Sequence, residues 1–245
     1  MTMSNFKAAL FDSVQRIARS VAAVLPQSCA LCTAPCASAL VCPPCRDALP
    51  WMPPACPCCA LPFPPGAACD LPCGRCLAQP PPWGCVNAAF AYAYPLDRLV
   101  VAMKYRGALA YADLFAEALA PRVKVHADAL VAIPLTPARQ RARGFNQADE
   151  IARRLARGCG IPLRHGLARV HESPAQAASG RRERIRNMRN AFTAQPALHG
   201  KRIALVDDVL TTGATLAAAA NALRRVGAEV VGALVVARTL GTASQ

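Results

Sequence analysis

Downstream of residue 86 the chain alternates short apolar runs with stretches of helical periodicity. The apolar runs predict strands at 88–94, 128–134, 163–170, 201–208 and 228–240, and the periodic stretches predict helices at 96–104, 108–124, 146–157 and 214–227. A turn with two prolines is predicted between the strand at 128–134 and the helix at 146–157. Strands separated by helices form βαβ units, in which helices cover both faces of a mainly parallel sheet. The strands at 201–208 and 228–240 are almost continuously apolar, as expected for the buried centre of such a sheet. The pattern therefore predicts an α/β domain.

The first 86 residues follow a different pattern. Helical spacing over 5–25 predicts an amphipathic helix, which could pack on its own domain or lie on a membrane surface. Between 26 and 85 proline and cysteine dominate, as in PPACPCCALPFPPG (53–66). Proline removes backbone donors and blocks the α conformation of the preceding residue, so long helices and central strands are not expected there. The expected organisation is a helix at 1–25, a cysteine-rich segment at 26–85 and the α/β domain at 86–245.

Composition excludes several classes of protein. Hydrophobic residues make up 54% of the 245 residues, which is too many for a disordered chain. No apolar run approaches the roughly 20 residues of a membrane-spanning helix, so an integral membrane protein is not expected. Asp12, Arg16 and Arg19 interrupt the stretch where a signal peptide needs apolar residues. We therefore expect a cytoplasmic protein with reduced thiols, in which clustered cysteines indicate metal rather than disulfides.

Eight of the 13 cysteines form four CxxC pairs in the N-terminal part of the chain. The pairs predict two metal sites, with the ligands Cys29, Cys32, Cys42 and Cys45 in the first and Cys56, Cys59, Cys73 and Cys76 in the second. Four thiolates make a soft tetrahedral site, which zinc prefers, so a double zinc ribbon is expected. The ligand sets are closed, and the zinc would therefore be structural, holding together a segment that lacks a regular core.

The cysteine pattern leaves alternatives open. A redox CxxC needs a thioredoxin-like βαβ setting, which is absent from this segment, and an iron–sulfur cluster could use the same ligands. An interleaved arrangement, in which the first and third pairs share a metal, is a further alternative. Cys58 also competes with Cys59 as a ligand in the third pair.

Positive charge is concentrated in the second half of the chain. The net charge is +14, and residues 136–202 hold 15 basic and four acidic residues, which places 11 of those charges there. Such a concentration suits a polyanion such as pyrophosphate, a sugar phosphate or nucleic acid. The alternative is a solvated, arginine-rich surface.

A phosphate-binding turn is predicted in IALVDDVLTTGAT (203–215). A buried strand ends in Asp207 and Asp208, and a turn rich in threonine and glycine then opens a helix. Such a turn aims backbone N–H groups and hydroxyls at one point, to which the helix adds its positive end. Gly213 allows a close approach of the backbone to the anion. The alternative is a helix cap with two surface acids, but adjacent carboxylates at a buried strand end are costly unless they bind cations or hydroxyls.

This stretch resembles the ribose-phosphate signature of the type I phosphoribosyltransferases. The resemblance implies that Asp207 and Asp208 contact the ribose hydroxyls of phosphoribosyl pyrophosphate (PRPP) and stabilise the positive charge that develops on the sugar. It implies that the 5-phosphate is held by Thr211, Thr212, Gly213, Ala214 and Thr215. Mg²⁺ would bridge pyrophosphate and ribose oxygens, with few ligands from the protein.

Three more segments, at 99–107, 132–148 and 173–192, complete a resemblance to the ComF family, which is linked to DNA uptake and natural transformation. Members join a zinc-ribbon segment to a type I phosphoribosyltransferase-like domain. The resemblance assigns Lys104, Arg106, Arg139 and Arg143 to PRPP binding, next to Asn146 and Gln147, and it assigns Gln176, Arg184, Asn187 and Phe192 to a loop that closes over the substrate. Ala132, Thr136 and Ser179 stand where the family often has proline, histidine and leucine.

Two functions are consistent with these features. The first is a PRPP-binding phosphoribosyltransferase that acts in nucleotide metabolism during DNA uptake. The second is a binding module for single-stranded DNA, with DNA-uptake proteins as partners. Basic charge and zinc ribbons fit the second function. The pair Asp207–Asp208 favours the first, because a protein that binds only DNA needs no acceptors for ribose hydroxyls.

Overall fold

The computed structural model describes residues 27–36, 39–64, 66, 71–170 and 191–240. The chain divides into two compact units, Met1–Leu49 and Pro50–Gln245. The helix predicted over 5–25 lies outside the described residues, as do Gln176, Ser179, Arg184 and Asn187. In the described ranges, no helix has the length and apolar character needed to cross a membrane.

The smaller unit contains a short cysteine-rich fold. Strands β1 (Gln27–Ser28) and β2 (Pro35–Cys36) pair in antiparallel fashion and are followed by helix α2 (Pro43–Asp47). Helix α2 begins directly after Cys42, with prolines in its first turn, where the missing N–H costs nothing. Proline is thus used here to start a helix rather than to prevent one.

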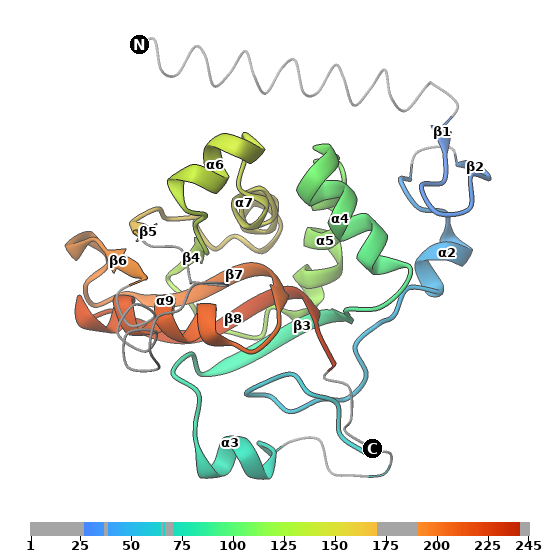
Figure 1. The fold of residues 1–245 in the computed structure, drawn as a ribbon. Helices are drawn as coiled ribbons and strands as arrows, with labels where there is room; N and C mark the ends of the chain where they lie inside the picture. The colour runs from blue at the N-terminus through green and yellow to red at the C-terminus, as the bar shows by residue number, and fades with distance from the viewer. Residues whose placement is uncertain (1–26, 37–38, 65, 67–70, 171–190, 241–245) are drawn as a thin grey trace, which may run out of the picture. The chain divides into compact units, whose positions relative to one another are not determined.

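A four-stranded parallel sheet forms the centre of the larger unit (Figure 1). The strand order is β3 (Cys85–Ala91), β8 (Glu229–Arg238), β7 (Arg202–Leu210) and β4 (Ala129–Ala132). The two almost continuously apolar strands, β7 and β8, occupy the centre, as predicted. The α/β fold with a parallel sheet is confirmed.

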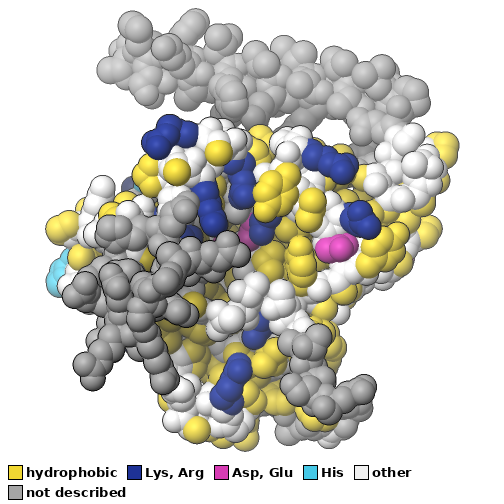
Figure 2. Space-filling model, in the orientation of Figure 1, with side chains coloured by type: hydrophobic (Ala, Val, Ile, Leu, Met, Phe, Trp, Pro, Cys, Tyr) yellow, Lys and Arg dark blue, Asp and Glu magenta, His cyan; other side chains and the backbone are white. Residues whose placement is uncertain are grey.

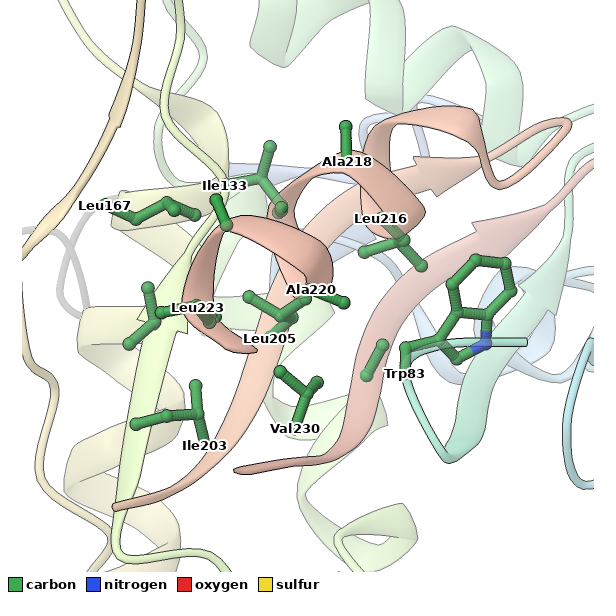
Figure 3. Close-up of a cluster of buried hydrophobic side chains, with 14 of the residues drawn as sticks. Trp83, Ile133, Leu167, Ile203, Leu205, Leu216, Ala218, Ala220, Leu223 and Val230 are labelled. Atoms are coloured by element: carbon green, nitrogen blue, oxygen red, sulfur yellow. The ribbon is translucent and has the colours of Figure 1, made fainter. Parts of the chain in front are cut away.

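Helices cover both faces of this sheet (Figure 1). Helices α4 (Leu96–Arg106), α5 (Tyr111–Leu119) and α7 (Gln147–Cys159) lie on one face, and α9 (Ala214–Arg225) lies on the other. Alternate residues of β7 face opposite layers, so that Ile203 and Leu205 belong to the cluster under α9. Figure 3 shows the members of this cluster that α9 and the sheet contribute, with Trp83 at one end: Leu216, Ala220, Leu223, Ile203, Leu205 and Val230.

Three local predictions differ from the structure. The turn with two prolines is helix α6 (Pro137–Arg143), because Thr136 caps it by accepting a hydrogen bond from Arg139 N at 3.3 Å. The helix predicted over 108–124 spans only α5, and a 3₁₀ turn at Ala120–Arg122 follows it. Of the strand predicted at 163–170, Leu163 forms an isolated parallel bridge with Leu130 of β4, whereas Leu167–Arg169 is β5, which pairs with β6 (Phe192–Ala194) in a separate antiparallel ribbon. A second 3₁₀ turn, Pro196–Leu198, precedes β7.

The cysteine-rich residues of the larger unit run along its sheet edge. Trp51 forms a bridge with Phe90 of β3, and the two rings stack with centroids 4.5 Å apart. Further on, Val86 N donates to Pro57 O at 2.7 Å. Helix α3 (Gly74–Ala78) follows, and it carries Cys76. The second cysteine set therefore belongs to the same compact unit as the α/β sheet, whereas the first set lies in the unit Met1–Leu49.

Candidate functional site

The candidate site lies at the carboxyl end of β7, where ligands bind in open α/β sheets. Asp207 and Asp208 are part of the strand, which continues to Leu210. A cavity of about 240 Å³ opens beside them. Its walls bring together six of the predicted site residues, Lys104, Arg139, Arg143, Asp207, Asp208 and Thr215, and add Arg169 and Tyr105.

The two acids have different surroundings. Asp208 is only 6% exposed, and its Oδ2 lies 2.9 Å from Lys104 Nζ on helix α4. Asp207 Oδ1 accepts a hydrogen bond from Asp208 N at 2.9 Å. Burial and the neighbouring charge of Asp208 raise the pKa of Asp207 to about 8, although Lys104 and Arg169 act in the opposite direction. A pKa raised by burial and by a like charge is typical of carboxylates at functional sites.

Helix α6 presents arginines to the cavity. Arg139 lies in its first turn and Arg143 in its last. Arg143 Nη1 donates to Gln147 Oε1 at 2.7 Å, and the guanidinium lies 5.2 Å from the centroid of the Tyr105 ring. The packing and the hydrogen bond hold the planar group in place at the cavity wall. Fixed guanidinium groups suit phosphate oxygens, because they can donate two parallel hydrogen bonds.

A second, more open pocket of about 540 Å³ shares some of these walls. It is lined by Lys104, Tyr105, Arg106, Gly107, Arg139, Ala142, Arg143 and Phe145. Arg106 lines this pocket, whereas it is not among the residues around the acids. Figure 2 shows Lys and Arg side chains predominating over acidic ones on the face that carries α4 and α6. The basic surface predicted from the charge distribution is thus present in the described part of the chain.

Three residues of the predicted pyrophosphate and loop segments have structural positions. Asn146 caps α7, since its Oδ1 accepts from Ala148 N at 3.1 Å, while its Nδ2 donates to Ile133 O at 2.9 Å. Phe192 is 1% exposed in the core under α9. Thr136, which replaces the family's usual histidine, is 3% exposed and caps α6. These side chains shape the site without lining the cavity.

The phosphate turn, which we define as residues 210–215, joins β7 to α9. Gly213 is the N-terminal cap of α9 and has a φ of +84°, a left-handed conformation that favours glycine. A Cβ at this position would lie 2.6 Å from the Trp83 ring. Thr212 Oγ1 accepts a hydrogen bond from Ala214 N at 3.3 Å. The turn joins β7 to α9 as predicted, but Thr212, Gly213 and Ala214 line another pocket, of about 400 Å³, on the Trp83 side, whereas Thr215 lines the cavity beside the acids.

Both cysteine sets have the geometry of a four-thiolate metal site. In each set the four Sγ atoms lie within 4.8 Å of one another. Neighbouring sulfurs are 3.6 Å apart for Cys32 and Cys42 and 3.8 Å apart for Cys59 and Cys73. A tetrahedral zinc ion with Zn–S bonds of about 2.3 Å would space its sulfurs by about 3.8 Å. The residues therefore fit zinc, and each set joins consecutive CxxC pairs rather than the first and third pair.

Backbone N–H groups lower the pKa of one cysteine in each set. Burial by itself would raise the pKa of Cys29, but N–H groups of Cys32, Cys42 and Leu31 lower it to about 6. In the second set the pKa of Cys56 is likewise about 6, since N–H donors that include Cys73 N at 3.2 Å outweigh its burial. Stabilised thiolates favour metal binding near neutral pH, because the bound form of a cysteine is deprotonated.

Sequence reasoning missed two residues that hold the phosphate turn. Arg238, at the end of β8, is only 6% exposed, and its guanidinium contacts backbone carbonyls of the turn. Trp83 packs against Gly213. The one available signal was an arginine inside the apolar run of β8, where a charged side chain needs partners. Only the fold reveals what those partners are.

Comparison with known proteins agrees with this architecture. A family model described as phosphoribosyl transferase domain matches residues 135–244, the part of the chain that holds α6, β7, the phosphate turn and α9. The DNA utilization protein YhgH of Salmonella typhimurium is 35% identical over 227 residues, which cover 88% of this chain and 99% of that protein. Competence protein F of Haemophilus influenzae is 33% identical over 169 residues, 64% of this chain and 74% of that one. The chain belongs to the ComF family.

ComF membership confirms the predicted class, a type I phosphoribosyltransferase-like domain with N-terminal cysteine clusters compatible with zinc ribbons. Among solved structures, the chain is similar to glutamine PRPP amidotransferase from B. subtilis at 22% identity and a TM-score of 0.38, over 52% of this chain and 26% of that one.

Proposed function

We propose that this ComF protein binds the ribose 5-phosphate part of PRPP and, with Mg²⁺, transfers it to an acceptor as a phosphoribosyltransferase. The observation that carries the proposal is the cavity in which Asp207 and Asp208 face Lys104 and the arginines of α6. Acidic and basic side chains around one cavity suit a ligand with a hydroxyl-bearing sugar and an anionic leaving group. A site for an anion alone would not need the two carboxylates.

The acid pair would bind the sugar. An ionised carboxylate is an acceptor only, so it suits the 2- and 3-hydroxyls of ribose. Asp208 is paired with Lys104, and the positive charge of bound Mg²⁺ would lower the raised pKa of Asp207 and so favour its ionised form. Departure of pyrophosphate leaves positive charge on the sugar, and Asp207 and Asp208 lie where they would stabilise it. When bound, Mg²⁺ neutralises pyrophosphate oxygens and so makes pyrophosphate a better leaving group.

The phosphate groups would lie on either side of the acid pair. The 5-phosphate would bind at the phosphate turn, where the N-terminus of α9 adds partial positive charge and Thr215 adds a hydroxyl. The pyrophosphate would lie toward Lys104, Arg139 and Arg143, which line both the cavity and the neighbouring basic pocket. In this orientation the basic side chains bind the pyrophosphate and the two acids bind the sugar.

A cellular role in DNA uptake or the use of imported DNA is part of the proposal. Relatives are named DNA utilization protein and competence protein F, and both names connect this family to exogenous DNA. A phosphoribosyltransferase in that setting would act in nucleotide metabolism. The structural zinc proposed for the two cysteine sets would stabilise the N-terminal part of the protein.

Calorimetric titration with PRPP and MgCl₂ tests the proposal. The wild-type protein should bind PRPP, and the double variant Asp207→Asn/Asp208→Asn should bind it at least tenfold more weakly, since it loses two charged acceptors for the ribose hydroxyls. Asp97→Asn is a matched control, because this partly exposed acid in the first turn of α4 is not among the residues that line the cavity. Equal affinity of the double variant and the wild type would refute the site, and absence of PRPP binding by the wild type would refute the function.

A second function, binding of single-stranded DNA, is favoured by the basic pocket of about 540 Å³. Tyr105 at its wall is 73% exposed, and Arg143 stacks on this ring. An exposed aromatic ring among basic side chains is the combination that binds bases by stacking and the backbone by charge. The two functions could share Lys104 and Arg143, so that DNA would compete with PRPP.

Fluorescence anisotropy with a labelled oligonucleotide separates the two functions. If DNA binds here, Tyr105→Ala should weaken binding about tenfold, because the loss of base stacking costs about 1–3 kcal/mol. The affinity should also fall steeply as salt rises to about 0.15 M. Tyr94→Ala is the control, since Tyr94 is 75% exposed and is not among the residues that line the pocket. DNA binding that is insensitive to salt, or equal loss in both variants, would contradict this second function.

A further inference from the structure

Residues of the second cysteine set and of the phosphate turn line the same pocket, within one compact unit. The pocket of about 400 Å³ has Cys59 and Cys76 on one wall and Thr212, Gly213 and Ala214 on another. Two side chains, Arg238 and Trp83, connect these walls. Each makes one contact with the backbone of the Cys56–Cys59 turn and another with the phosphate turn.

Arg238 provides the first connection. Its Nε donates to Cys59 O at 2.9 Å, and its Nη1 donates to Leu210 O at 2.9 Å and also contacts Thr211 O. Four thiolates with one Zn²⁺ would carry a net negative charge, which would partly compensate the buried Arg238 cation. The metal site would thus stabilise the arginine that holds the first residues of the phosphate turn.

Trp83 provides the second connection. Its indole Nε1 donates to Cys58 O at 2.9 Å, inside the Cys56–Cys59 turn. The far edge of the same ring lies against Gly213, with no room for a Cβ between them. The ring is 7% exposed and belongs to the core cluster under α9 (Figure 3). A shift of the cysteine turn would therefore move the indole and, through it, the start of α9.

We infer that the second cysteine set, Cys56, Cys59, Cys73 and Cys76, positions the phosphate turn, and that Trp83 and Arg238 transmit its metal-bound geometry. The two cysteine sets then have different roles. Loss of metal from the second set weakens ribose-phosphate binding, whereas loss from the first set does not act on the turn through these contacts. The inference rests on the proposed function for its ligand, but the link between metal site and turn can be measured without ligand.

Trp83→Phe is the sharpest variant for the test. Phenylalanine keeps an aromatic ring in the core but lacks the N–H that donates to Cys58 O. In the full-length zinc-loaded protein, we expect faster amide hydrogen exchange at 210–216 and about 3- to 10-fold weaker binding of ribose 5-phosphate, at unchanged zinc content. Trp51→Phe is the matched control, because Trp51 stacks on Phe90 at the edge of β3 and is not among the residues around the turn.

Cysteine variants provide the second arm. Cys59→Ser/Cys76→Ser should accelerate exchange at 210–216, whereas Cys32→Ser/Cys45→Ser should leave it as in the wild type, although each pair removes one metal. Equal acceleration in both pairs would indicate general loosening and would overturn the inference. Unchanged exchange at 210–216 in Trp83→Phe would also overturn it. If exchange responds as expected but the wild type binds no ribose 5-phosphate, the link stands and the proposed function fails.

Discussion

Gly213→Ala should destabilise the larger unit by about 2–4 kcal/mol, through two separable terms. The left-handed φ of +84° costs a residue with a Cβ about 1 kcal/mol. The new Cβ would also lie 2.6 Å from Trp83, well inside the usual contact of about 3.5–4.0 Å, and overpacking of a core commonly costs about 1–3 kcal/mol. The ring is tied to Cys58 O and cannot move away without losing that hydrogen bond.

Urea denaturation followed by circular dichroism measures both terms. Gly160→Ala isolates the backbone term, because Gly160 has a φ of +72° and open space where a Cβ would be placed. This control should lose about 1 kcal/mol. In a Trp83→Phe background the clash should be relieved, since the phenyl ring is smaller than the indole, and Gly213→Ala should then cost little more than Gly160→Ala. The reasoning is refuted if Gly213→Ala and Gly160→Ala cost the same in the wild-type background, or if Trp83→Phe leaves the difference intact.

Three further predictions concern charge and metal. Burial and the charge of Asp208 raise the pKa of Asp207 in the folded protein to about 8, whereas the value in the unfolded chain is about 4. Between these two pH values the folded state holds a proton that the unfolded state has lost. The free energy of unfolding should therefore fall as pH rises from about 4 to 8. Asp207→Asn should flatten this slope in denaturation curves measured between pH 5 and pH 8, and an unchanged slope would contradict the assignment. Lys104→Met should lower the free energy of unfolding at pH 8 by about 2 kcal/mol, because it leaves Asp208 buried without its cation; equal or higher stability would show that the ion pair contributes nothing. Metal analysis should find about two zinc ions per chain and about one in Cys32→Ser/Cys45→Ser, and one or none in the wild type would exclude a double zinc ribbon.

The elements whose periodicity was strong were predictable from the sequence. The apolar runs of β7 and β8 place them in the centre of a parallel sheet, because strands covered on both faces need apolar side chains in every position. The turn after β7 was also predictable, since glycine readily adopts the left-handed φ that Gly213 has here. The cysteine spacing predicted two metal sites, and the structure brings together the same eight thiols.

Other features depended on contacts between segments that are distant in sequence. Helix α6 was missed because its proline was interpreted as part of a turn, whereas Thr136 and Pro137 together begin a helix. The strand at 163–170 was predicted as part of the main sheet, but its partner, Phe192–Ala194, was not predicted at all. A short strand has no pairing preference of its own strong enough to show in the sequence.

The sequence by itself determined the chemistry available to this ComF protein: two acids at a strand end, a glycine turn, basic residues upstream and two sets of four thiols. Tertiary structure decided which of these groups meet. It placed Lys104 beside Asp208. Asn146 and Phe192 do not line the cavity, because the first caps α7 and the second lies in the core. Trp83 and Arg238 connect the second cysteine set to the phosphate turn. The physical reason is that residue types and their spacing can be read along the chain. Ion pairs and close contacts form only when side chains that are far apart in the chain are packed at fixed distances.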